Sequence, residues 1–173
     1  MSVAEKLTTI AQNQQLVYDA GYEAGMYDGG IEVGLLGSIL DSSITTLYYD
    51  KITKTGTYSL SYRSDLVSAE LPNLVSLGNW TFAYCTKLQW VKLQSATQIL
   101  NYAFSGDREL TTLILGSQTV CSLDSANVFR GTPIESGTGY IYVPDELVDK
   151  YKVATNWSAF ANQIKPISEL EEN

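Results

Sequence analysis

The sequence repeats itself every 22 residues through its middle, and this repeat restricts the possible folds more than any other feature does. Three consecutive copies align without a gap: residues 44–65, 66–87 and 88–109. A fourth copy opens at Leu110 and is stretched by about two residues before Phe129. The copies share an L-x-x-L-x-L opening, and a single repeat of this kind cannot bury its own apolar side chains. The middle of the chain is therefore predicted to be a stack of repeats that bury these side chains against one another.

The last two apolar residues of each opening lie two positions apart, which is the periodicity of a β-strand. Both therefore point to one face of a short strand, and the residue between them points to the other. The predicted strands centre on five pairs: Leu47–Tyr49, Ala69–Leu71, Val91–Leu93, Leu113–Leu115 and Ile141–Val143. A later pair in each repeat is expected to close the far side of the stack: Tyr58 with Leu60, Trp80 with Phe82, and Tyr102 with Phe104.

A period of about 20–29 residues with this opening is typical of a leucine-rich repeat solenoid. The repeats resemble the bacterial leucine-rich repeats of the BspA-like type, which carry an aromatic residue near the end of each unit, as Asn101–Phe104 does here. The first copy departs from the pattern, with Thr55 where later copies have Leu77 and Ile99. The expected fold class is α+β: a leucine-rich repeat solenoid of about four 22-residue coils with a short parallel sheet, an N-terminal helix and a helical C-terminal cap.

The resemblance extends to both ends of the chain. The stretch 137–169 is similar to the ending of such repeats in proteins encoded by phages and prophages of gut Firmicutes. The stretch 2–21 is similar to the start of phage structural proteins from the same source. The resemblance implies a binding or structural module of a virion and not an enzyme.

Four segments are expected along the chain: an N-terminal helix for oligomerisation or attachment over 1–25, a glycine-rich connection over 26–43, the repeat solenoid over 44–144, and a helical cap with an acidic tail over 145–173. Ser2 and Glu5 form a capping box at the start of the first helix. Steps of three and four residues then form a heptad seam: Val3, Leu7, Ile10, Gln14 and Val17. This helix either associates with copies of itself or lies along the first coil.

Two helices are expected to cap the last coil. Asp145 is predicted to cap a helix that ends near Val153, and Asn156 a second one from Trp157 to about Ile164. A terminal repeat of a solenoid needs such a cover for its exposed apolar side. Residues 168–173 are expected to fray into solvent.

Charge and residue types exclude several classes of function. The 19 acidic and 11 basic side chains give a net charge of −8, which argues against nucleic acid and anionic membrane surfaces as partners. The chain has no histidine, so Ser-His-Asp and Cys-His arrangements are excluded. Cys85 and Cys121 are interpreted as small buried apolar residues, and too few ligands cluster for a metal site. We expect that the protein is not an enzyme and that it binds no cofactor.

The outward strand positions are expected to stack into two ladders. One contains Thr46, Ser68, Trp90, Thr112 and Tyr140, and the other contains Tyr48, Glu70, Lys92, Ile114 and Tyr142. Tyr and Trp are frequent anchors of interfaces. The candidate partner-binding residues are Tyr48, Trp90, Lys92, Tyr140 and Tyr142. The alternative is that these aromatic side chains serve cross-strand packing alone.

These observations and the resemblance predict a non-enzymatic phage virion protein of a tail, baseplate or capsid fibre. Its expected partners are a protein or surface polysaccharide of a host cell, other virion proteins and further copies of itself, with three chains as the first expectation. No secretory signal or membrane-spanning run is found in the sequence, which fits a virion component made in the host cytoplasm. The alternatives are a cytoplasmic protein-interaction module, for example an inhibitor of a host factor, and a fragment of a bacterial surface adhesin.

Overall fold

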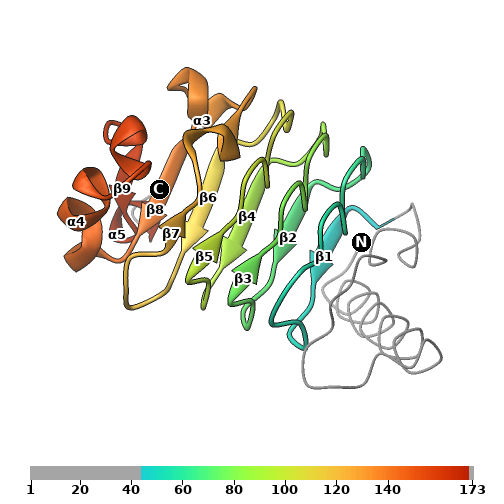
Figure 1. Ribbon diagram of the computed structural model, residues 1–173, viewed down its shortest axis with the longest axis horizontal. Coiled ribbons are helices and arrows are strands. Elements are labelled where there is room, and N and C mark those ends of the chain that lie inside the picture. The colour runs from blue at the N-terminus through green and yellow to red at the C-terminus, as the bar shows by residue number, and fades with distance from the viewer. Residues whose placement is uncertain (1–43, 172–173) are drawn as a thin grey trace.

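The computed structural model describes residues 44–171, and successive repeats there form a six-stranded parallel sheet. In spatial order its strands are β1 (Thr46–Tyr48), β2 (Ser68–Glu70), β4 (Trp90–Leu93), β6 (Thr112–Leu115), β8 (Tyr140–Val143) and β9 (Ile164–Pro166). Figure 1 shows the repeats side by side along the long axis of the molecule. The five predicted strand positions are confirmed. The predicted N-terminal helix, its seam and the glycine-rich connection lie outside the described residues.

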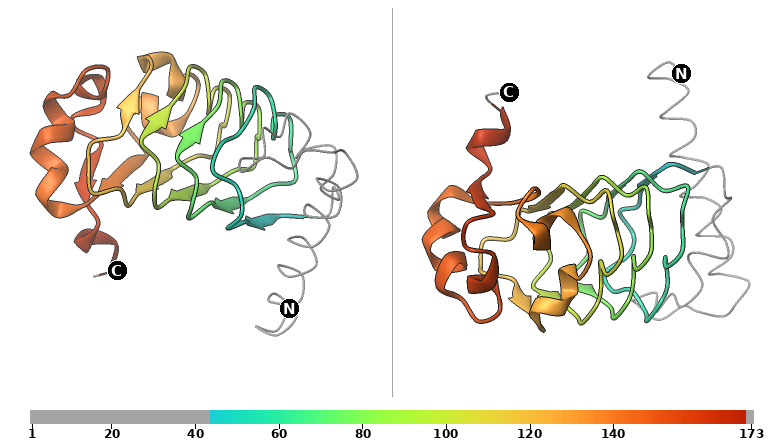
Figure 2. Two further views of the ribbon diagram at one scale, coloured as in Figure 1. Left: turned by 60° about the horizontal axis from the view of Figure 1, so that its bottom comes forward. Right: turned by 90° about the horizontal axis from the view of Figure 1, so that it is seen from above.

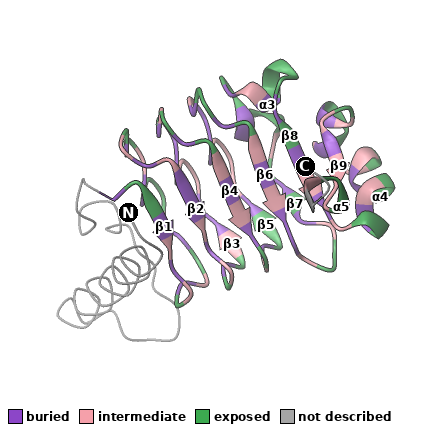
Figure 3. Cartoon of the chain, turned by 180° about the vertical axis from the view of Figure 1, so that it is seen from behind, coloured by how far each residue is buried: buried purple, intermediate pink, exposed green. Residues whose placement is uncertain are grey.

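The register of the sheet follows the sequence repeat. Leu47 pairs with Ala69, Ala69 with Val91 and Val91 with Leu113, each 22 residues further along the chain. These four side chains are buried, and the strands β4 and β6 alternate between a core side and a more exposed side (Figure 3). On β2 the neighbour Ser68 is buried as well. The period of two within a strand therefore sets the face, and the period of 22 sets the partner.

A second parallel sheet, which the sequence analysis did not predict, lies on another side of the repeats (Figure 2). Its strands are β3 (Ser76–Leu77), β5 (Gln98–Ile99) and β7 (Ser122–Leu123). A bridge between Lys54 and Ser76 continues the pattern into the first repeat. There Thr55 takes the inward position and satisfies its hydroxyl, which accepts the Gly78 N–H at 2.8 Å and lies 2.9 Å from the Thr81 hydroxyl.

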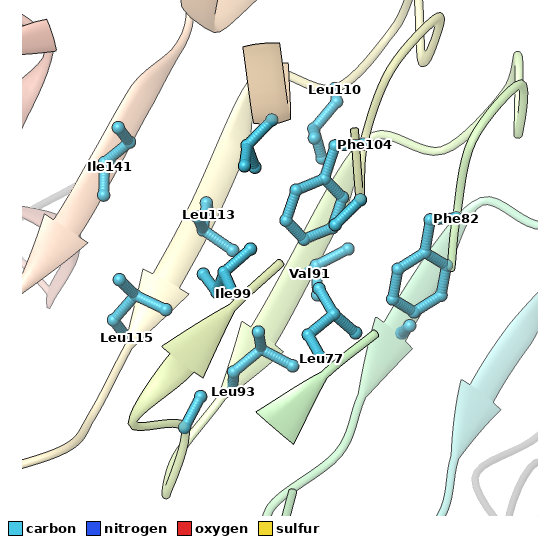
Figure 4. Packing of buried hydrophobic residues seen from close by; sticks show 14 of the residues in the cluster. Leu77, Phe82, Val91, Leu93, Ile99, Phe104, Leu110, Leu113, Leu115 and Ile141 are labelled. Atoms are coloured by element: carbon cyan, nitrogen blue, oxygen red, sulfur yellow. The ribbon is translucent and has the colours of Figure 1, made fainter. Parts of the chain in front are cut away.

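A column of stacked phenylalanines fills the interior between the sheets. Phe82 and Phe104 are parallel to within 3° at 5.6 Å, and Phe104 and Phe129 to within 1° at 5.7 Å. Figure 4 shows the first two rings in the same orientation in successive repeats. Phe129 follows Phe104 by 25 residues, so the fourth repeat is three residues longer than the others rather than about two. The predicted burial of Leu60, Phe82 and Phe104 is confirmed.

The structure corrects the expectation for the other member of each pair. Tyr58, Trp80 and Tyr102 have φ angles of 60°, 56° and 57°, so the backbone is left-handed and their side chains turn away from the phenylalanine column. A large side chain rarely adopts this conformation, which costs about 1–3 kcal/mol per residue. Stacking of neighbouring rings at 5.8 Å and 4.2 Å contributes about 0.5–1.5 kcal/mol per pair and offsets part of that cost.

Short helices cover the last repeat at the C-terminal end of the stack (Figure 1). They are the 3-10 helices η1 (Ala126–Phe129), η2 (Asp145–Leu147) and η3 (Trp157–Phe160), and the α-helices α3 (Pro133–Ser136), α4 (Val148–Val153) and α5 (Ser168–Glu171). Two buried side chains of these helices form hydrogen bonds with the backbone of Cys121. The Tyr151 hydroxyl accepts its N–H at 2.8 Å, and the Trp157 indole donates to its carbonyl at 2.6 Å.

The helix predicted to end near Ile164 is wrong in its second half. Helix η3 ends at Phe160, and Ile164–Pro166 forms β9, which pairs in parallel with β8. The reason is that β8 would otherwise leave an open edge, and a strand satisfies its backbone groups where a helix cannot. Asn156 does not cap η3 either, because its side-chain amide donates instead to the carbonyls of Leu123 and Asp124 at 2.8 and 3.0 Å.

Asp145 also has a different role from the predicted one. It makes no side-chain cap for the helix that follows, and its carboxylate accepts the backbone N–H of Ser168 at 3.2 Å. Hydrogen bonding from the Ser168 side chain, and then from its backbone N–H, holds the pKa of Asp145 below its usual range. Residues 168–171 form the helix α5, so the prediction that this stretch frays into solvent is wrong for these residues.

Candidate functional site

The outward side of the six-stranded sheet, named here the sheet face, carries both predicted ladders in register. The first is Thr46, Ser68, Trp90, Thr112 and Tyr140, and the second is Tyr48, Glu70, Lys92, Ile114 and Tyr142. Because adjacent strands lie about 4.8 Å apart, Trp90 is about 10 Å from the ladder positions on β1 and on β8. The five predicted site residues therefore share one surface but lie on three separate strands, β1, β4 and β8.

Aromatic groups gather at the β8 end of the sheet face. The rings of Tyr140 and Tyr142 are 6.4 Å apart, and Tyr140 is 39% exposed. The Lys165 ammonium lies 5.9 Å from the centre of the Tyr140 ring, close enough for a cation–π contact. Lys165 also lies 3.4 Å from the carboxylate of Glu169. Sequence reasoning missed Lys165 because it placed this residue at the end of a helix and not on a sixth strand.

The two charged residues in the middle of the sheet face, Glu70 and Lys92, form an ion pair with no net charge. The Lys92 ammonium lies 3.0 Å from the Glu70 carboxylate on the neighbouring strand. Residues 44–144 contain seven acidic and seven basic side chains, so the repeats carry no net charge. The acidic excess of the whole chain therefore lies outside the repeats, and charge alone gives the sheet face no preference for a cationic or an anionic partner.

Comparison with known proteins assigns these repeats to a family. A family model described as "BspA type Leucine rich repeat region (6 copies)" matches residues 41–138. The chain belongs to this family. Among solved structures, the crystal structure of the pneumococcal vaccine antigen PcpA is similar, with a TM-score of 0.38 and 14% sequence identity. The match covers 72% of this chain and 40% of the antigen chain, so this BspA-type chain spans less than half of that structure. No curated protein matched the sequence.

The buried ionisable groups of this BspA-type chain form a column inside the turns and are not part of the sheet face. Arg63, Cys85 and Asp107 occupy one position of the 22-residue template and are all buried. The Arg63 guanidinium makes two bonds to Asp65, at 2.9 and 3.2 Å, and this contact lowers the pKa of Asp65. The template alignment of the three residues was visible in the sequence and is the signal that could have found this column.

Asp107 is the most unusual member of the column. One carboxylate oxygen accepts the Cys85 N–H at 2.8 Å, and the other has no partner among the residues that the structure describes. Burial raises the pKa of Asp107 well above its usual value, so burial favours the neutral form. The column lies under the turns without access to the sheet face, and we assign it to the interior.

The two cysteines are buried and not bonded to each other, as predicted. Burial raises the pKa of both thiols, in the case of Cys121 to about 12. A thiol with such a pKa is an inert core residue, since the thiolate is the reactive form. Within residues 44–171, no group of three potential ligands converges as a metal site requires, and no helix there is long and apolar enough to cross a bilayer.

Proposed function

We propose that this chain is a non-enzymatic recognition module that binds a partner protein or a surface polysaccharide of a host cell through the sheet face. The leucine-rich repeats are of the protein-interaction or adhesin-like kind, and we infer that they form a solenoid of about four 22-residue coils. The observation that carries the proposal is the register of the outward ladders, which places Trp90 and the Tyr140–Tyr142 pair on one continuous surface. Parallel stacks of repeats use such faces to bind partners.

The chemistry of the sheet face supports a partner surface that is uncharged or carries charges of both signs. Trp90 and Tyr142 are half-buried, so their rings are held in place while one side stays accessible. Rigid aromatic side chains lose little conformational entropy on binding and dominate many interfaces. The Glu70–Lys92 pair adds polar groups without net charge.

We further propose that the module belongs to a phage virion, in a tail, baseplate or capsid fibre, and assembles with copies of itself. The similarity of stretches 2–21 and 137–169 to phage-encoded proteins supports this assignment. The heptad seam from Val3 to Val17 supports self-association. The first expectation of three chains comes from the resemblance to fibre proteins and not from the seam. A monomeric chain would favour the alternative of an intracellular protein-interaction module.

The test replaces two anchors with residues that the same ladders already carry. In Trp90→Thr with Tyr142→Ile, the new side chains match Thr112 and Ile114 on β6, so the sheet should keep its fold. Loss of one anchor typically costs about 2 kcal/mol or more, which is about 30-fold in Kd. We expect that loss in binding to host cells or to isolated host envelopes.

A control and a contrary outcome complete the test. Val153→Ser changes an 81% exposed apolar residue of α4 that lies away from both ladders, and it should bind like the parent chain. Circular dichroism of all three proteins reports their fold. If the double variant is folded and binds the host envelope as tightly as the parent does, the sheet face is not the binding surface.

A further inference from the structure

A second aromatic surface lies on the turns that follow the second sheet, away from the strand ladders. It consists of two rows of stacked rings, named here the aromatic ridge: Tyr58, Trp80 and Tyr102 in one row, Tyr62 and Tyr84 in the other. The ring centres are 5.8 and 4.2 Å apart along the first row and 5.0 Å apart in the second. Tyr62 is 68% exposed, so the ridge protrudes from the surface.

The fold does not require aromatic residues at the positions of the second row, Tyr62 and Tyr84. All five have left-handed backbone angles, which large side chains rarely adopt. The third and fourth repeats place Gly106 and Gly131 at the position of Tyr62 and Tyr84, with φ angles of 83° and 75°. Glycine takes this conformation without strain. Side chains kept in a strained conformation and exposed to solvent point to a function beyond stability.

The ridge carries hydrogen-bond donors that have no partner among residues 44–171. These donors are four phenol hydroxyls and the Trp80 indole N–H. The ridge contains no charged side chain. Its natural ligand is therefore uncharged where it touches the rings, apolar between its polar atoms, and rich in hydrogen-bond acceptors.

We propose that the aromatic ridge binds an extended, proline-rich segment of a partner protein in the polyproline II conformation. The carbonyl groups of such a helix make no internal hydrogen bonds and are free to accept from the phenol and indole donors. One turn of this helix rises about 9.3 Å, which matches the two ring-to-ring steps of the row from Tyr58 to Tyr102. Aromatic-lined surfaces with such donors are a recurring mode of recognition for proline-rich segments.

The orientation of the rings favours a peptide over a glycan. A sugar ring stacks on an open aromatic face, whereas the inner faces in both rows are covered by the neighbouring ring. What the rows present to solvent is a series of ring edges and hydroxyls. Prolines can pack against these edges from the solvent side while their carbonyls meet the donors.

The test uses the full chain and a decaproline peptide with blocked ends, with binding followed by calorimetry. A (Gly-Ser)5 peptide and maltohexaose serve as competing ligand classes. Tyr62→Gly with Tyr84→Gly copies the residue that the chain itself has at Gly106, and so should fold. Trp90→Thr on the sheet face is the matched aromatic control.

We expect saturable binding of decaproline, at least tenfold weaker binding by the glycine double variant, and unchanged binding by Trp90→Thr. A second variant, Tyr58→Phe with Tyr62→Phe and Tyr84→Phe, keeps the rings and removes three donors. It should bind several-fold more weakly even if the glycine variant does not fold. The proposal is overturned if decaproline does not bind, if (Gly-Ser)5 or maltohexaose binds as tightly, or if both ridge variants bind like the parent. Because the ridge and the sheet face are different surfaces, neither outcome decides the other.

Discussion

The ring of Tyr84 lies directly on the backbone of Gly106, one repeat further along the chain. A Cβ atom added to Gly106 would come within 2.6 Å of the Tyr84 ring. The row of Tyr62 and Tyr84 therefore ends on a glycine, and the absence of a side chain there makes room for the last ring. This contact links a strained turn in one repeat to a strain-free turn in the next.

Gly106→Ala should destabilise the chain by about 2–5 kcal/mol. The methyl group meets the Tyr84 ring, which costs about 1–3 kcal/mol, and the left-handed backbone adds about 1–2 kcal/mol. Gly131→Ala is the control, since its φ is also positive but its nearest neighbour is 3.7 Å away. Urea unfolding of both variants separates the ring contact from the backbone strain. Equal losses in the two variants would mean that the Tyr84 ring yields freely.

Phe104→Ala should cost about 3–5 kcal/mol of unfolding free energy, because it leaves a cavity between two stacked rings in the centre of the repeats. The measurement is equilibrium unfolding in denaturant, followed by circular dichroism. Val153→Ala, at an 81% exposed position, should change stability by less than about 0.5 kcal/mol. A loss below about 1 kcal/mol in Phe104→Ala would contradict the central place of the phenylalanine column.

Asp107 should make the chain less stable as the pH rises. Its folded pKa lies well above 3.8, so the folded state holds the proton more tightly than the unfolded state does. The contribution of Asp107 is therefore fully favourable below about pH 3.8, and it is lost as the pH rises towards and through the folded pKa. Asp107→Asn keeps an oxygen for the Cys85 N–H and removes the titration.

The measurement for Asp107 is the difference in unfolding free energy between parent and Asp107→Asn at pH 4 and at pH 8. We expect the variant to gain relative to the parent at the higher pH. Asp65→Asn is a control without this trend, because the contact with Arg63 lowers the pKa of Asp65, and the contribution of Asp65 is lost only as the pH falls from about 3.8 through that lowered pKa. A difference that does not depend on pH for Asp107→Asn would show that Asp107 is ionised in the folded chain.

Removal of residues 1–25 should convert an oligomer into a folded monomer. The heptad seam that motivates self-association lies within this segment, and the repeats from residue 44 onward have a core of their own. Light scattering on the full and shortened chains measures the mass, and circular dichroism measures the fold. Unfolding of the shortened chain would instead make the segment a cover for the first repeat.

The strand ladders could be predicted from the sequence because they depend on two short periods. Alternation within L-x-x-L-x-L fixes which side of each strand is buried, and the 22-residue repeat fixes which residue lies beside which, as in the pairing of Trp90 with Thr112. The pairing of strands does not require repeats of equal length, since β8 keeps the register with β6 after a longer repeat. The sheet face was therefore predictable residue by residue, apart from Lys165.

The aromatic ridge and the end of the chain were decided only by the tertiary structure. Tyr102 and Phe104 are two apart like strand residues, yet the backbone at Tyr102 is left-handed and its ring stacks on Trp80 of the preceding repeat, whereas Phe104 lies in the core. Ile164–Pro166 became a strand because β8 offered an open edge, whatever the local helix signals. The pKa of Asp107 is raised by burial, which exists only in the folded chain. The sequence by itself determined what repeats along the chain, whereas contacts between repeats decided each feature whose cause lies in a neighbouring segment.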